Sequence, residues 1–145
     1  MASPEVYEAF ETRLSENWMT LPLAFENEPR QQLVEGGQPF VYVEIFGDDF
    51  NQETAGAPGA NLWQERGSIF MHVMVPSGEG SKQARIWAKA LLALFREQEV
   101  IVDAATGEAL MMPEMSIGAG QPGEDIPNYW ALTATIHWSR HEATT

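Results

Sequence analysis

The side chains that could do acid–base or metal chemistry in this sequence are two pairs of adjacent carboxylates and three histidines. The carboxylate pairs are Asp48-Asp49 and Glu124-Asp125, and each lies in a stretch rich in Gly and Pro. Neighbouring side chains on extended backbone point to opposite sides, so neither pair converges on one substrate. We expect solvated loop charges, with a weak divalent-ion contact shared between subunits as the alternative.

The histidines, His72, His137 and His141, do not form a recognisable metal motif. His72 and His137 fall on the same side of two expected strands, but no third ligand follows at a spacing typical of zinc. We therefore expect histidines that face solvent or a neighbouring subunit. The chain has no Cys, which excludes disulfides, thiolate metal sites and cysteine nucleophiles.

Nucleophilic and phosphate chemistry also lack their usual sequence patterns. An activated nucleophile needs a base and an orienting group, and no Gly-x-Ser-x-Gly motif is present. Gly78-Glu79-Gly80-Ser81 resembles a phosphate-binding loop in outline, but it lacks the spacing and the Gly-Lys ending of a P-loop. We interpret it as a strand-to-helix turn. The sequence thus predicts no catalytic residue, no cofactor and no metal, and a protein that is not an enzyme.

The distribution of charge is more informative. The chain of 145 residues has a net charge of −13, yet half of its 8 basic residues fall on one face of an expected helix. They are Lys82, Arg85, Lys89 and Arg96. Because nucleic-acid binding needs a basic surface, these cations on so acidic a body make a poor clamp. Two interpretations stay open: a solvated helix face, or a charge-complementary contact with an acidic surface of a neighbouring copy or partner.

The length and composition indicate one globular domain over residues 1–145. Hydrophobic residues make up 44% of the chain and are spread along it, which argues against disorder. The first residues show no basic region followed by an apolar run, and no apolar run is long enough to span a membrane. We expect a soluble protein that is made in a cytoplasm and has no membrane partner.

The elements that position these residues follow from apolar spacing and turn residues. Ser3-Pro4 and Ser81 each precede apolar residues at helical spacing, which predicts helices over about 4–17 and 81–98. Strands are expected at about 40–46, 63–75, 100–102, 110–117 and 129–138. Pro113 places the fourth of these at a sheet edge or a bulge. A loop or irregular extended segment is expected at about 21–38, and loops are expected at about 47–60 and 118–128.

This order predicts an α+β fold, with a mostly antiparallel sheet of about four to five strands and two main helices packed on one face. The β-branched residues Val41, Val43 and Ile45 mark the core face of the first strand. The opposite face carries a second apolar set: Phe40, Tyr42, Phe46, Phe70 and Met74. A monomer seldom exposes so large a patch, so either the sheet is buried on both faces or a second chain covers it.

Four segments resemble a family of tail terminator-like proteins from long-tailed phages, prophages and gene transfer agents. They are Trp18–Pro29, Pro39–Val43, Gly67–Gly80 with the helix after it, and Tyr129–Ile136. The Val-Pro-x-Gly-x-Gly turn before the helix is the most distinctive, and the likeness extends over about residues 7–138. The sequence departs from the family in a longer stretch at 55–60 and an extended loop at 118–127.

The resemblance implies a structural virion protein without catalytic residues. Its expected form is a ring, usually of six subunits, that terminates the tail tube at its head-proximal end and joins it to the neck. The implied partners are other copies of the chain, the tail tube protein and a head completion or neck protein. DNA would pass through an acidic lumen without specific binding. Another head–tail joining protein or a tail tube subunit is the alternative, and a small-molecule binding module is a remote one.

The candidate contacts with other subunits, the tube or the neck lie in the two long loops, at Arg66 near the start of the second expected strand, and on the basic helix face. They are Asp48, Asp49, Phe50, Gln52, Arg66, Lys82, Arg85, Lys89, Arg96, Glu124 and Asp125.

Overall fold

A computed structural model of the chain describes residues 2–28, 34–78, 80–122 and 128–143. Its main sheet has the strand order β1-β2-β3-β8-β6, and β7 pairs with β8. The bounds are β1 Leu23–Phe25, β2 Phe40–Gln52, β3 Leu62–Pro76, β6 Met111–Ile117, β7 Gln121–Pro122 and β8 Tyr129–Ala143. Only the β1–β2 pair is parallel among the described strands. The expected mostly antiparallel sheet is confirmed.

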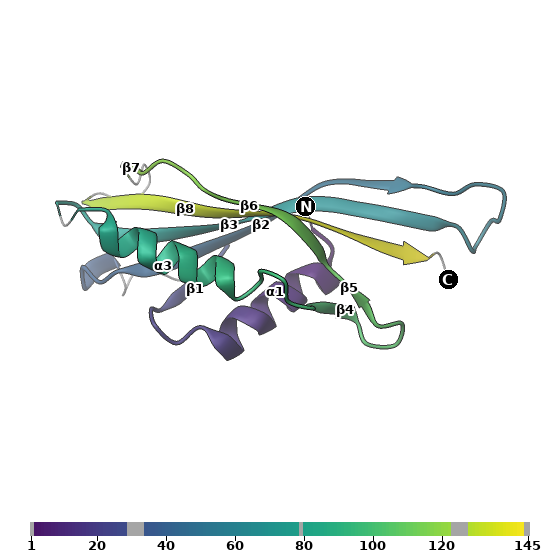
Figure 1. Cartoon of the computed structure of the whole chain (residues 1–145), viewed down its shortest axis with the longest axis horizontal. Helices are drawn as coiled ribbons and strands as arrows, with labels where there is room; N and C mark the ends of the chain where they lie inside the picture. The colour runs from purple at the N-terminus through teal and green to yellow at the C-terminus, as the bar shows by residue number, and fades with distance from the viewer. Residues whose placement is uncertain (1, 29–33, 79, 123–127, 144–145) are drawn as a thin grey trace.

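Two helices, α1 (Pro4–Asn17) and α3 (Lys82–Ala93), cover one face of this sheet (Figure 1). Phe10 of α1 packs against Phe95, just beyond α3, with ring centroids 5.5 Å apart. Beneath the helices lies the sheet face that the sequence assigned to the core. Its buried residues are Val41, Val43, Ile45, Ile69, Met71 and Val73. The α+β class and the core face are therefore confirmed.

The two helices differ in how closely they follow the sequence prediction. α1 begins at Pro4, as expected, although the hydroxyl of the N-cap residue Ser3 does not cap it. α3 ends at Ala93, earlier than the expected residue 98. Phe95 N–H donates to Leu92 O, three residues back, so the chain tightens and Phe95 enters the core. Arg96 therefore lies beyond the helix.

The loop or irregular extended segment expected at 21–38 contains one short strand that was not predicted, β1 at Leu23–Phe25. The sequence does not indicate this strand, because it has only three residues and follows Pro22, a residue typical of loops. β1 pairs in parallel with residues 41–43 of β2, and no local pattern announces a non-local pair of this kind. Most of the segment's other described residues lie in turns or irregular structure.

The expected loop at 47–60 was also wrong over its first part. β2 continues to Gln52 and β3 begins at Leu62, so the loop is confined to residues 53–61. The pairing slips between Gly47 and Asp49, where Asp48 is the extra residue of a bulge. β8 likewise runs to Ala143, beyond the expected end at Trp138. We call residues 47–67 and 139–143 the β-arm, which projects past the helices in Figure 1.

The region after α3 follows the prediction more closely. β4 (Ile101–Asp103) and β5 (Glu108–Ala109) form a separate hairpin, and Gly107 adopts φ 74° in the turn between them. β6 lies at the edge of the main sheet, with a register shift between Met111 and Glu114. Pro113 falls within this shift, which confirms the predicted edge or bulge.

Among the residues that the structure describes, buried side chains cover one end of the helix-free face of the sheet. A second buried cluster lies there, made of Ala24, Phe40, Met74, Tyr129 and Ala131, with Tyr42 packed against it. Farther along the same face Phe46 is 41% exposed and meets the half-buried Phe70 edge-on. Burial within the chain therefore accounts for Phe40 and Met74 but leaves Phe46 open to solvent.

Candidate interaction surfaces

Three polar side chains on the helix-free face form one hydrogen-bonded chain. His72 Nε2 lies 2.6 Å from Glu44 Oε1, and His72 Nδ1 lies 2.7 Å from Thr133 Oγ1. A carboxylate, an imidazole and a hydroxyl in this order can activate a nucleophile. No pattern in the sequence indicates this group, because its members come from β2, β3 and β8 and meet only through the strand register.

The surroundings of this chain are those of a structural cross-strand bond. Thr133 lies inside β8, whose backbone pairs with β3 along its whole length and with β6 and β7 on the other side. Phe70 stacks on His72 with the ring centroids 6.2 Å apart, on an open sheet face. None of the hollows described below includes these residues. We interpret the group as stabilising the sheet across three strands.

The other two histidines each contact a polar side chain on a neighbouring strand or on the β-arm. His137 lies on the same sheet face as His72, as expected, and its Nδ1 is 2.9 Å from Ser68 Oγ. His141 Nε2 is 3.0 Å from Glu53 Oε2 on the β-arm. Within the part of the chain that the structure describes, no group of three or more His, Asp or Glu side chains could hold a metal.

The β-arm brings together five of the predicted contact residues: Asp48, Asp49, Phe50, Gln52 and Arg66. Asp49 accepts two hydrogen bonds from the Arg66 guanidinium, at 2.7 and 3.1 Å. These bonds, with the positive charge of Arg66, hold the pKa of Asp49 below its usual value. Phe50 is 43% exposed and lies beside Trp63, with ring centroids 5.6 Å apart. The arm therefore presents charge and aromatic surface together.

A buried ion pair fixes the base of the β-arm, and sequence analysis missed it. Arg140 of β8 and Glu65 of β3 face each other in register, each side chain 3% exposed, with Arg140 Nε donating to Glu65 Oε1 at 2.8 Å. Ser3 donates to both carboxylate oxygens of Glu65, through its backbone N–H and its hydroxyl, each at 2.8 Å. This cluster ties the start of α1 to the arm.

The outward face of α3 carries three of the four predicted cations. Lys82, Arg85 and Lys89 are all exposed, and Ile86 between them is 51% exposed. Together with Ser81, Ala90 and Ala93 they line a broad, open surface that is only slightly hollowed, with a volume of about 670 Å³. We call this surface the α3 ridge. It combines positive charge with apolar contact area, and α3 contains no acidic residue.

A second hollow, of about 400 Å³, lies between α1 and β4. Its floor includes Ala9, Val100 and Val102, and Ile101 beside them is 41% exposed. Its acidic residues are Glu5, Glu8, Glu16 and Glu99. Arg13 also lines it and donates from Nε to Leu94 O at 2.9 Å. We call this surface the α1–β4 groove, which the sequence did not reveal because β4 and α1 are far apart in the chain.

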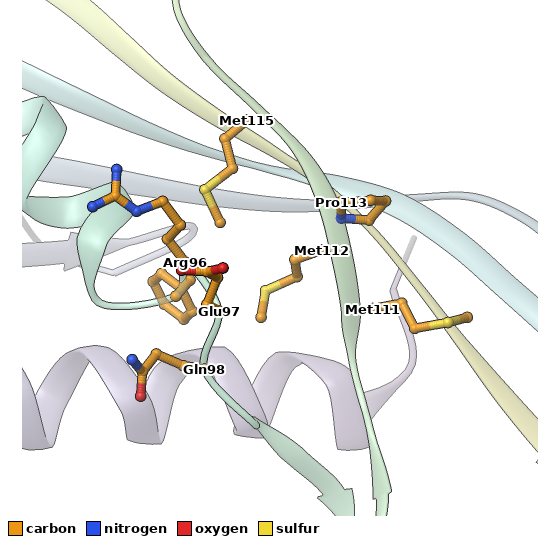
Figure 2. Close-up of a pocket in the computed structure, with 8 residues that line it drawn as sticks. Arg96, Glu97, Gln98, Met111, Met112, Pro113 and Met115 are labelled. Atoms are coloured by element: carbon orange, nitrogen blue, oxygen red, sulfur yellow. The ribbon is translucent and has the colours of Figure 1, made fainter.

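Arg96, the fourth predicted cation, lies in a different hollow of about 600 Å³ between the end of α3 and β6. Figure 2 shows Met112 and Met115 projecting from β6 toward the segment that carries Arg96 and Glu97. Met side chains suit adaptable apolar contact, whereas a small-molecule site needs converging polar groups. The structure thus separates Arg96 from the other three cations.

Two predicted contacts, Glu124 and Asp125, lie outside the described residues. Among the residues that are described, no helix combines the length and the apolar character needed to cross a bilayer.

One of the comparisons with known proteins assigns a family to this chain. No curated protein matches this chain. A solved structure with 24% sequence identity is similar over 97% of this chain and 96% of its own, with a TM-score of 0.60, and this likeness shows the fold alone. The sequence profile of a family described as phage tail terminator protein matches residues 5–138. The chain therefore belongs to the phage tail terminator family, a structural family of phage tails.

Proposed function

We propose that this chain forms a ring, of six copies, that ends the tail tube at its head-proximal side and joins it to the neck. The observation that carries the proposal, beside the family, is the β-arm. It extends past the helical layer and carries exposed Phe50 and the paired Asp49 and Arg66. An arm held by a buried ion pair is rigid enough to make a defined contact beyond its own subunit.

In this proposal the arm makes contacts along the ring axis, with the tail tube protein or with a head completion or neck protein. The ring itself needs a different contact, between neighbouring copies, that repeats by rotation until it closes. The net charge of −13 fits a conduit, because an acidic lumen repels phosphates and lets DNA pass without specific binding. The role requires no catalysis, cofactor or metal, and it places the protein in the virion tail after synthesis in the host cytoplasm.

The test is the form that the purified protein takes, alone and with tail tubes. Negative-stain images and the mass in solution should show closed rings, or single subunits that form rings on tube ends. Long tubes built from this chain alone would instead identify a tube subunit. A protein that stays monomeric and never binds tube ends would refute the proposal.

A further inference from the structure

We propose that the α3 ridge of one copy docks into the α1–β4 groove of the next copy. The inference rests on the proposed ring and names the contact that would close it. Its occupant is a second copy of this chain, because the chain itself carries both halves of a complementary pair.

The first half is basic and apolar. Lys82, Arg85 and Lys89 follow one another at spacings of three and four along α3, so they project from one side of the helix. Ile86 lies among them and is half exposed, and with Ala90 and Ala93 it adds apolar contact area between the cations. A surface for phosphate would not need Ile86, whereas a protein contact uses an apolar centre with charges around it.

The second half is acidic and apolar. The α1–β4 groove carries four carboxylates and one guanidinium, from Arg13. Glu5 lies 3.6 Å from the buried Arg140, so Glu8, Glu16 and Glu99 supply the excess of negative charge. Arg13 is partly buried and its Nε is bonded to Leu94 O, so part of its donor capacity is used inside the subunit. The apolar floor at Val100 and Val102 and the exposed Ile101 would receive Ile86 and the alanines of the ridge.

The two surfaces share no residue and lie on different elements, so their contact is heterologous: each copy offers its ridge to one neighbour and its groove to the other. A contact of this kind builds a ring when its rotation closes. Neither surface includes the β-arm, which stays available for the tube or the neck. Opposite charges on the two sides would fix the register and disfavour ridge-to-ridge contacts, where cations would meet.

The experiment uses two full-length variants with reversed charge. The first is Lys82→Glu/Arg85→Glu/Lys89→Glu, with an acidic ridge and an acidic groove. The second is Glu8→Lys/Glu16→Lys/Glu99→Lys, with a basic ridge and a basic groove. All six positions are exposed, so both variants should keep the circular dichroism spectrum of the unchanged protein.

We expect each variant alone to assemble at least about tenfold more weakly than the unchanged protein, because every contact would join like charges. An equal mixture should restore rings in which the two variants alternate, which a ring of six permits. Single variants serve as matched controls, because Arg96 and Glu114 lie outside both surfaces. Arg85→Glu should weaken assembly more than Arg96→Glu does. Glu8→Lys should likewise weaken it more than Glu114→Lys does.

The outcomes separate this inference from the proposed function. If the unchanged protein never forms rings, alone or on tube ends, the proposed ring fails and the contact fails with it. If the unchanged protein forms rings and either triple variant does too, the ring stands and the contact is wrong. If each variant is disrupted but the mixture stays disassembled, the two surfaces do not pair with each other.

Discussion

The buried pair of Glu65 and Arg140 gives the most quantitative prediction. Both side chains are 3% exposed, and Arg140 also donates to the Ser3 hydroxyl at 2.9 Å. Removing one partner leaves the other buried charge without its closest counter-ion, which costs about 3–5 kcal/mol. Glu142 and Glu5 lie 3.4 and 3.6 Å from Arg140, but they are 44% and 51% exposed and compensate its charge only in part. We therefore expect Arg140→Met or Glu65→Leu to lower the free energy of unfolding by about that amount. For a chain of this size the melting temperature should fall by about 10–15 °C.

The double variant Glu65→Leu/Arg140→Met tests the cause. Replacing both charges by apolar side chains removes the cost of desolvating the two ions together with the attraction between them. The loss of the pair itself should therefore change the free energy of unfolding little. Ser3 would still lose the acceptor for its N–H, at 2.8 Å in the unchanged protein. An unmet donor costs about 1–3 kcal/mol, so the double variant should be less destabilised than either single one.

The neighbouring ion pair is the matched control. Arg66 is next to Glu65 in the chain, and its side chain is 54% exposed where it meets Asp49. An exposed pair contributes about 0–1 kcal/mol, so Arg66→Ala should change stability little. Urea and thermal unfolding of all four variants, followed by circular dichroism, supply the double-mutant cycle. Additive losses for Glu65 and Arg140, or single losses as small as that of Arg66→Ala, would refute the reasoning.

Two further predictions concern the base of the β-arm. Gly67→Ala should destabilise the protein by about 1–3 kcal/mol, because the added Cβ would lie 2.0 Å from the backbone oxygen of Phe46 and the sheet backbone would have to shift. Gly118→Ala is the control, because its added Cβ would lie 3.7 Å from the nearest atom, the backbone oxygen of Thr133. Equal melting temperatures for the two would contradict the packing argument. Asp49 should titrate below its usual value in NMR spectra and return toward it in Arg66→Ala. Because folding lowers the pKa of Asp49, this carboxylate stabilises the folded protein at any pH above its pKa in the unfolded chain. The stabilisation disappears as the pH falls through the pKa of Asp49 in the folded protein.

Much of the fold could be predicted because its signals are local. Pro4 and the apolar spacing after it locate α1. Alternation at Val41, Val43 and Ile45 identifies the core face, which the structure buries almost completely. Pro113 marks an irregular edge strand without any knowledge of its partner. In each case the residue's own conformational preference, or its hydrophobic period, decides the outcome.

The missed features depend on partners far away in the chain. Gly47, Asp48 and Asp49 have the composition of a turn, but their pairing with β3 keeps them in a strand and turns the extra residue into a bulge. The extended β3–β8 register, in turn, brings Arg140 opposite Glu65 across 75 positions of sequence. No periodicity within either strand indicates such a partner.

The same reason explains why the basic helix face could be recognised before its acidic counterpart. Lys82, Arg85 and Lys89 share one helix, so their common direction follows from helical spacing alone. The groove forms only where α1 packs against the β4–β5 hairpin, so Glu8 and Glu99 gain a common surface through tertiary structure. A charged helix face on a strongly acidic chain therefore defines only half of a contact. In the contact that we propose, folding supplies the other half, because it brings Glu8 and Glu99 to one surface.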